Sequence, residues 1–178
     1  MHNNPKVRRN KLLAEAEGYL ALEMYDHALR ALDAITDLGK IAYAVHALRA
    51  EVLRQKEDFP AAAIAFERAL GERPDEVPLL MGVAWCYKRT DRLPQAIEAM
   101  QRAYQASPKE AVVLYNLACY WALAGNKAQA LSWLGRALRM DQNLRHLIPD
   151  EHDFDPLRDD PDFSLIIGDQ NSEAPGST

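Results

Sequence analysis

Apolar and polar residues follow one another along most of this chain at spacings of three and four, in runs that come in pairs. Such spacing puts the apolar side chains on one face of an α-helix and the polar side chains on the other. The pattern therefore predicts eight amphipathic helices in four antiparallel pairs. The predicted helices span residues 10–22 with 25–37, 41–55 with 59–71, 76–89 with 93–106, and 110–123 with 127–139.

Prolines and turn-forming residues mark the ends of several predicted helices. Pro60 and Pro94 fall in a first helical turn, where a missing N–H loses no hydrogen bond. Pro74 follows a helix that it would not let continue. Asp91 and Gly125 stand where the chain must turn between the two helices of a pair.

Equivalent residues recur every 34 positions, which reveals an internal repeat. In such a repeat each helix pair is one structural unit that stacks on the next. Small residues occupy some of the recurring columns, and large or aromatic residues occupy the others. The columns are Ala16, Ala50, Ala84 and Ala118; Tyr19, Leu53, Tyr87 and Trp121; Ala28, Ala62, Ala96 and Ala130; Leu32, Phe66, Met100 and Leu134; Ile35, Ala69, Ala103 and Ala137; and Pro74 with Pro108.

A unit of two helices with small, aromatic, small, large and proline columns resembles the tetratricopeptide repeat. The resemblance implies an all-α fold, a right-handed α-solenoid of antiparallel helix pairs. The first unit departs from the pattern, because Ile35 occupies a usually small column, and in the second unit His46 and Arg49 fall at usually apolar positions. The resemblance covers residues 9–144, as units 9–42, 43–76, 77–110 and 111–144.

The two ends of the chain differ from the repeats. Residues 145–167 keep apolar side chains such as Phe154 and Phe163 between prolines, and an end repeat must cover its exposed apolar face. We therefore expect residues 145–167 to form short helices that cap the last pair, similar to tails that follow such repeats in many bacterial proteins. Residues 1–8 are expected to be a basic N-terminal arm, and residues 168–178 a disordered tail.

Composition narrows the classes of partner and compartment. The formal net charge is −5, and residues 141–178 alone contribute −8, with ten acids against two bases. The remaining cations are scattered, which argues against nucleic acid as a partner. No stretch approaches the ~20 apolar residues that span a bilayer, and two cysteines are too few for a disulfide framework. We expect a cytoplasmic, soluble protein without membrane insertion.

The candidate catalytic and metal-binding residues fit structural roles better. Cys119 lies in the middle of a predicted helix, with no histidine within 25 residues along the chain. A reactive cysteine needs a helix N-terminus, a cation or a histidine base to lower its pKa, so we expect Cys119 and Cys86 to be packing residues. His146 and His152 are six apart, whereas helical metal ligands are four apart. We expect a protein that is not an enzyme, with no metal and no cofactor.

A partner-binding face is the better supported functional expectation. The resemblance implies that the first helix of each pair lines a concave groove. Trp85 and Tyr115 are large aromatic residues that packing within a pair does not require, and such residues dominate binding energies once a partner buries them. Alternatively, they pack on neighbouring helices or on the chain's own tail. The expected groove residues are Leu13, Glu17, Ala47, Glu51, Arg54, Met81, Trp85, Lys88, Arg89, Tyr115, Asn116 and Cys119.

One subtype of the family can be tested position by position. Carboxylate-clamp members hold acidic chaperone tails with lysine, asparagine and arginine at set groove positions. This chain has Leu13, Glu17 and Gly82 among those positions, so that clamp is absent. Apolar anchors beside Lys88 and Arg89 instead suit an extended or helical peptide that carries apolar side chains and a nearby acid.

Two functions remain open. The leading hypothesis is a non-enzymatic adaptor or scaffold that binds a peptide of a protein partner in the groove. In a narrower version it is similar, in size and fold only, to the small tetratricopeptide chaperones of bacterial type III secretion. The alternative is a self-associating structural protein, a homo-oligomer whose groove a neighbouring copy fills, because its two ends carry opposite charge.

Overall fold

The computed structural model describes residues 5–168, and these residues form α-helices and short 3-10 helices without a strand. The chain divides into two compact units, Met1–Arg92 and Leu93–Thr178. Among the described residues, no helix has both the length and the apolar character needed to cross a membrane. Residues 1–4 of the predicted arm and residues 169–178 of the predicted tail lie outside the described residues.

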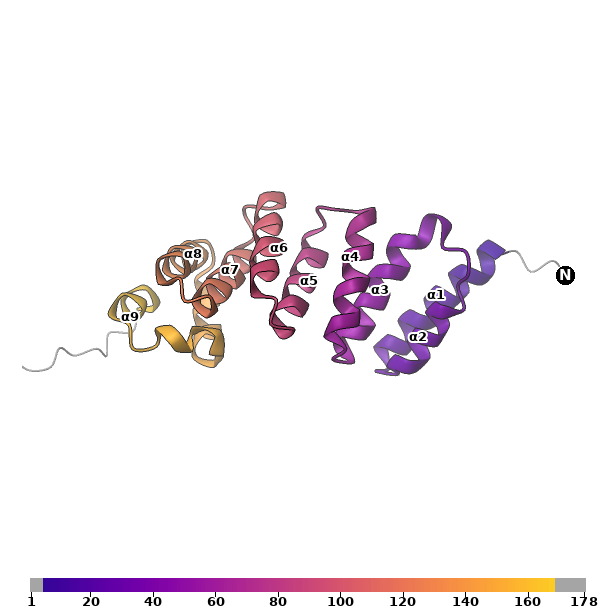
Figure 1. Ribbon diagram of the computed structural model, residues 1–178, viewed down its shortest axis with the longest axis horizontal. Helices are drawn as coiled ribbons and strands as arrows, with labels where there is room; N and C mark the ends of the chain where they lie inside the picture. The colour runs from indigo at the N-terminus through magenta and orange to yellow at the C-terminus, as the bar shows by residue number, and fades with distance from the viewer. Residues whose placement is uncertain (1–4, 169–178) are drawn as a thin grey trace, which may run out of the picture. The chain divides into compact units, whose positions relative to one another are not determined.

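The first unit is a series of helical hairpins (Figure 1). Its elements are α1 (Pro5–Ala21), α2 (Tyr25–Asp33), the 3-10 helix η1 (Gly39–Ile41), α3 (Ala42–Gln55), α4 (Phe59–Glu72) and α5 (Val77–Arg89). α1 packs on α2, α3 on α4, and α4 on α5. The first helices of successive pairs also touch, since α1 contacts α3 and α3 contacts α5.

The second unit continues the hairpins and ends in a segment of short helices. Its elements are α6 (Leu93–Ala106), α7 (Ala111–Leu123), α8 (Lys127–Met140), the 3-10 helices η2 (Gln142–Asp150) and η3 (His152–Leu157), and α9 (Pro161–Ile167). α7 packs on both α6 and α8, η3 contacts α7, and α8 contacts η2 and α9. Helices α3 to α8 agree with their predicted ranges to within one residue at either end.

The alanine columns of the repeat are fully buried between the helices. Ala16, Ala50, Ala84 and Ala118 are all 0% exposed, as are Ala28, Ala62, Ala96 and Ala130. Gly82 on α5 lies against the Phe66 ring of α4, because a Cβ atom there would lie 2.5 Å from the ring. Small side chains therefore let the helices of the hairpins meet, as the repeat pattern predicts.

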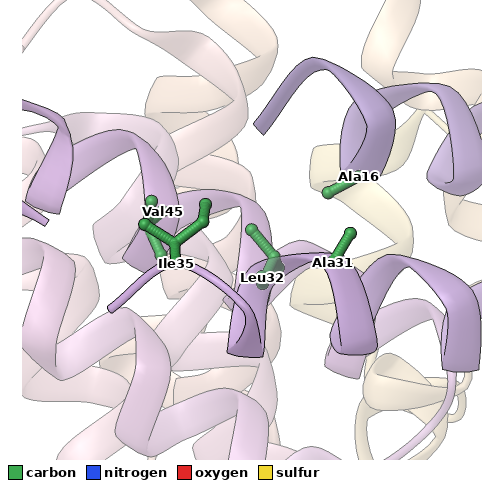
Figure 2. Packing of buried hydrophobic residues seen from close by; sticks show 5 residues of the cluster. All are labelled: Ala16, Ala31, Leu32, Ile35 and Val45. Atoms are coloured by element: carbon green, nitrogen blue, oxygen red, sulfur yellow. The ribbon is translucent and has the colours of Figure 1, made fainter. Parts of the chain in front are cut away.

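The first pair is irregular, and its bounds differ from the prediction. α1 begins at Pro5, within the segment predicted as a basic arm, and α2 ends at Asp33, before the predicted 37. Ile35 follows the end of α2 and is 7% exposed, in a cluster with Leu32 and Val45 (Figure 2). This large side chain occupies a column that is alanine in the other three repeats, and it is buried where the backbone has already left the helix.

The turn inside each hairpin has the same backbone conformation in all four repeats. One residue per turn has a positive φ of 56 to 71°, and these residues are 34 apart: Glu23, Glu57, Asp91 and Gly125. The next residue donates its N–H to the carbonyl five residues back, at 2.8 to 2.9 Å: Met24 to Tyr19, Asp58 to Leu53, Arg92 to Tyr87 and Asn126 to Trp121. This bond closes a Schellman-type helix end. A non-glycine residue in this conformation costs roughly 1 kcal/mol.

Candidate functional site

The expected groove residues of the first unit lie on α1, α3 and α5. Glu17 and Arg89 are exposed, whereas the other members of this set are half-buried. The half-buried members are Leu13 on α1; Ala47, Glu51 and Arg54 on α3; and Met81, Trp85 and Lys88 on α5. The side chains expected to meet a partner are therefore partly accessible in this unit.

Four residues from α3, α4 and α5 form a cluster of aromatic rings and guanidinium groups, which we call the Trp85 cluster: Arg54, Phe59, Trp85 and Arg89. The rings of Phe59 and Trp85 meet edge to face, with centroids 4.9 Å apart. The Arg89 guanidinium lies 4.8 Å from the Phe59 centroid and 5.5 Å from that of Trp85. The Arg54 guanidinium lies 5.6 Å from the Trp85 centroid, so two cations flank one indole ring.

The two arginines of the cluster differ in their charge partners. Arg54 donates two hydrogen bonds to Glu51, at 2.9 and 2.5 Å, and Gln55 donates a third at 2.7 Å. The Arg54 hydrogen bond holds the pKa of Glu51 below its usual value, and Glu51 raises the pKa of Arg54. Among residues 5–168, Arg89 contacts the two rings but no carboxylate. The cluster therefore presents one uncompensated cation beside a half-buried indole ring.

Cys86 lies on α5 next to Trp85 and takes no part in a reactive arrangement. It is 0% exposed. Burial raises the pKa of its thiol to about 11, although the nearby Arg54 acts in the opposite direction. A thiol with this pKa is almost entirely protonated at neutral pH, which matches the expected packing role.

In the second unit, the chain itself buries two of the expected groove residues. Tyr115 is 3% exposed and Cys119 is 1% exposed. The Tyr115 ring meets that of Phe154 edge to face at 5.6 Å, and Phe154 lies 5.5 Å from Phe163. The segment after α8 thus covers the face of α7 that carries Tyr115 and Cys119, whereas Asn116 stays half-buried. This packing on the chain's own tail is the alternative to an open groove at Tyr115.

Polar contacts hold this covering segment in place. Nη2 of Arg158 donates to the backbone carbonyls of Ile148, Pro149 and Glu151 at 2.8, 3.1 and 3.0 Å. Lys127 on α8 forms ion pairs with Asp160 and Asp162, at 2.6 and 2.8 Å. Asp160 also caps α9 by accepting from the N–H groups of Asp162 and Phe163. Satisfying these helix ends lets the short elements pack as one layer.

Beneath the segment lies a small polar group that the sequence did not single out. One ligand atom from each of Cys119, Glu151 and Asp153 lies within 4.8 Å of the other two. The nearby Tyr115 hydroxyl is buried without a hydrogen-bond partner. Burial is the main reason that the pKa of this hydroxyl is raised, and the charges of Cys119 and Glu151 raise it further. A thiol and two carboxylates are possible ligands for a divalent cation, but the absence of a metal stays a prediction.

The histidines considered for metal binding lie outside that group. His146 and His152 are exposed, and Nδ1 of His152 lies 3.2 Å from Asp155. The residue that sequence analysis missed is Phe59, the first residue of α4. Its column reads Tyr25, Phe59, Leu93 and Lys127, which is large and apolar in three of four repeats. That column is the signal that could have found it.

Comparisons with known proteins agree with this architecture. A family model described as tetratricopeptide repeat matches residues 13–77, 65–111 and 87–144. A curated relative, the general transcriptional corepressor ssn6 of Schizosaccharomyces pombe, is 25% identical over 151 residues, which are 80% of this chain and 14% of that protein. The chain therefore spans about a seventh of this relative's length.

Solved structures of similar fold come from several proteins. A MamA structure from Desulfovibrio magneticus superposes with a TM-score of 0.70 at 18% identity, covering 80% of this chain and 78% of that chain. YrrB is described as a tetratricopeptide repeat protein with an unusual peptide-binding site. Its structure superposes with a TM-score of 0.69 at 18% identity, covering 76% of this chain and 70% of that chain. The PilF structure of Pseudomonas aeruginosa superposes with a TM-score of 0.65 at 18% identity, covering 97% of this chain and 80% of that chain. These likenesses confirm the predicted all-α fold of stacked helix pairs.

Proposed function

The chain belongs to the tetratricopeptide repeat family, and we propose that it binds a peptide segment of a protein partner at the Trp85 cluster. The fold is that of a protein–protein interaction module. The observation that carries the proposal is the pairing of a half-buried indole ring with Arg89, a cation that no carboxylate among residues 5–168 neutralises. We take its role to be that of an adaptor without catalytic activity.

The chemistry of the cluster sets the kind of peptide. An aromatic or aliphatic side chain would pack against Trp85 and the half-buried Met81, whose flexible thioether adapts to different shapes. A carboxylate next to that side chain would meet the Arg89 guanidinium, which already lies against the rings and loses little freedom on binding. Glu51 would keep Arg54 occupied, so the preferred peptide carries one acidic group at this point rather than several.

The closed face of α7 limits where the peptide lies. Because the segment after α8 buries Tyr115 and Cys119, we place the binding site on α3, α4 and α5. This narrows the expected groove to Ala47, Glu51, Arg54, Met81, Trp85, Lys88 and Arg89, with Leu13 and Glu17 on α1 at its edge. An adaptor and a secretion chaperone would use this surface in the same way.

A peptide-display selection on the immobilised full chain tests the proposal. Enriched peptides should carry an apolar residue beside Asp or Glu. Trp85→Ala should weaken their binding roughly 30-fold or more, as expected for an aromatic anchor worth about 2 kcal/mol. Arg89→Gln should weaken the binding of acidic peptides and spare that of their Gln or Asn analogues.

The matched control is Arg92→Gln. Arg92 is exposed and lies 4.3 Å from the ring centroid of Tyr87, so it has the same charge and a similar ring contact outside the cluster. All three variants should keep their helical content, and Arg89→Gln and Arg92→Gln should keep their melting temperature. Trp85→Ala also loses the ring contact with Phe59, so its binding is compared at a temperature where its helical content equals that of the wild type. Enriched peptides that bind Trp85→Ala as tightly as the wild type would refute the proposal. A sedimentation mass that rises with protein concentration and falls on Trp85→Ala would support the self-associating alternative instead.

A further inference from the structure

A hollow of about 260 Å³ lies between the first two turns of α1 and the loop that follows α2. α2 has 9 residues, whereas α4, α6 and α8 have 14 each, and loop residues after α2 line the hollow. Its walls include Arg8, Arg9 and Leu12 from α1, and Ile35, Thr36 and Asp37 from the loop. We call it the Arg8–Arg9 pocket. It belongs wholly to the first unit and shares no residue with the Trp85 cluster.

Arg9 is fixed in the wall of this pocket. Its side chain is only 15% exposed, and Nη1 donates to Asp37 at 3.2 Å. The guanidinium lies against the backbone of Gly39, where a Cβ atom would fall 2.5 Å from Nη1 and where φ is +43°. Nε of Arg9 is buried and donates to no acceptor. A buried donor without an acceptor is costly, and the side chain that carries this donor belongs to the lining of the hollow.

Further unused donors line the same hollow. Arg8 and Thr36 are exposed, and within residues 5–168 neither the Arg8 guanidinium nor the Thr36 hydroxyl has a hydrogen-bond or ion-pair partner. Asp37 is the carboxylate in the lining, but its side chain is 73% exposed and it engages only one edge of Arg9. Two guanidinium groups against one carboxylate leave the pocket with a charge of +1.

We propose that the Arg8–Arg9 pocket is a binding site for an oxyanion, a carboxylate or phosphate group carried by a partner or a small ligand. A guanidinium fork matches the spacing of two anionic oxygens, and a hydroxyl supplies a third donor. Leu12 and Ile35 give the pocket an apolar side that would accept the carbon chain of such a group. The proposal goes beyond peptide binding at the Trp85 cluster and does not depend on it.

Solution NMR of the full chain tests the site with two probes, inorganic phosphate and succinate, at constant ionic strength set with sodium chloride. The readout is the Nε–Hε signal of Arg9, identified by its loss in Arg9→Lys. Binding should move this signal and the Thr36 amide signal along one saturating curve. The probe with the lower dissociation constant shows whether the site prefers a phosphate or a carboxylate group.

Two variants with the same charge change distinguish the pocket from general attraction. Arg8→Gln should weaken binding about tenfold or more, the loss expected for a hydrogen bond to a charged group. Arg30→Gln removes an exposed arginine of α2 that does not line the pocket, and it should leave the curve unchanged. Shifts that grow linearly with probe, or that Arg8→Gln and Arg30→Gln reduce equally, would overturn the proposal. Thr36→Val should weaken binding less than Arg8→Gln does.

Discussion

Replacing Phe154 by alanine should open the covering segment while leaving the first unit folded. The Phe154 ring is 0% exposed and stands between Tyr115 and Phe163, at 5.6 and 5.5 Å. Removing a buried phenylalanine ring costs about 3–5 kcal/mol. η2, η3 and α9 are short, so most of that loss should appear as local opening of the segment rather than as global unfolding.

The two cysteines report this opening directly. Cys119 lies under the segment at 1% exposure, and Cys86 lies in the first unit at 0% exposure. A loss of about 3 kcal/mol raises the open population more than a hundredfold, and alkylation follows that population when the segment closes faster than the reagent reacts. Mass spectrometry of the alkylated peptides should show Cys119 reacting at least a hundredfold faster in Phe154→Ala, with Cys86 unchanged.

A surface substitution in the same segment provides the control. Leu165 on α9 is 80% exposed, so Leu165→Ala should leave both alkylation rates as in the wild type. The raised pKa of Cys86, about 11, keeps its background rate low at neutral pH. If Phe154→Ala accelerated both cysteines equally, the segment would not open by itself. If it accelerated neither, Phe154 would not cover Cys119.

Three other substitutions test features of the first unit. Glu57→Gly should raise the free energy of unfolding by roughly 0.5–1 kcal/mol in urea denaturation, because glycine adopts a φ of 65° without steric cost; an unchanged or lower stability would contradict that reason. Gly82→Ala should lower it by about 1–3 kcal/mol, since the new Cβ would collide with the Phe66 ring, and a neutral result would mean that Phe66 moves freely. Burial, followed by the charges of Arg68 and Arg49, lowers the pKa of His46 in the folded chain. Below about pH 6.5 the unfolded chain therefore binds a proton at His46 more readily than the folded chain does, and the free energy of unfolding decreases as the pH is lowered. His46→Leu should remove that part of the acid sensitivity in melting curves at pH 5 and pH 8, and an unchanged pH difference would refute the assignment.

The helix pairs were predictable because they depend on local patterns that recur four times. Small columns and apolar stripes predict α3 to α8 to within one residue. The bounds of the first helix pair were not predictable, because the repeat pattern does not indicate how the backbone adapts to Ile35. The helical backbone of α2 ends at Asp33, and the loop that follows lines the Arg8–Arg9 pocket. No motif in the sequence predicts this pocket.

The candidate site was predictable only in part, for a similar reason. Trp85 and Arg89 follow from their columns, since groove positions on a first helix recur every 34 residues. Phe59 belongs to a second helix and enters the cluster through its position at the end of a turn. The burial of Tyr115 depends on Phe154, which is outside the repeats, so no column of the repeat pattern carries information about it.

The four hairpin turns suggest how the chain could be lengthened. Each turn contains one residue in the left-handed conformation, followed by the same closing hydrogen bond, and these turns recur every 34 residues. A duplicate of residues 58–91 inserted after Asp91 would therefore begin and end on an identical backbone joint, and the residues that follow would resume in phase. The turn thus acts as a module boundary, and the segment that covers α7 would keep its contacts with the last repeat.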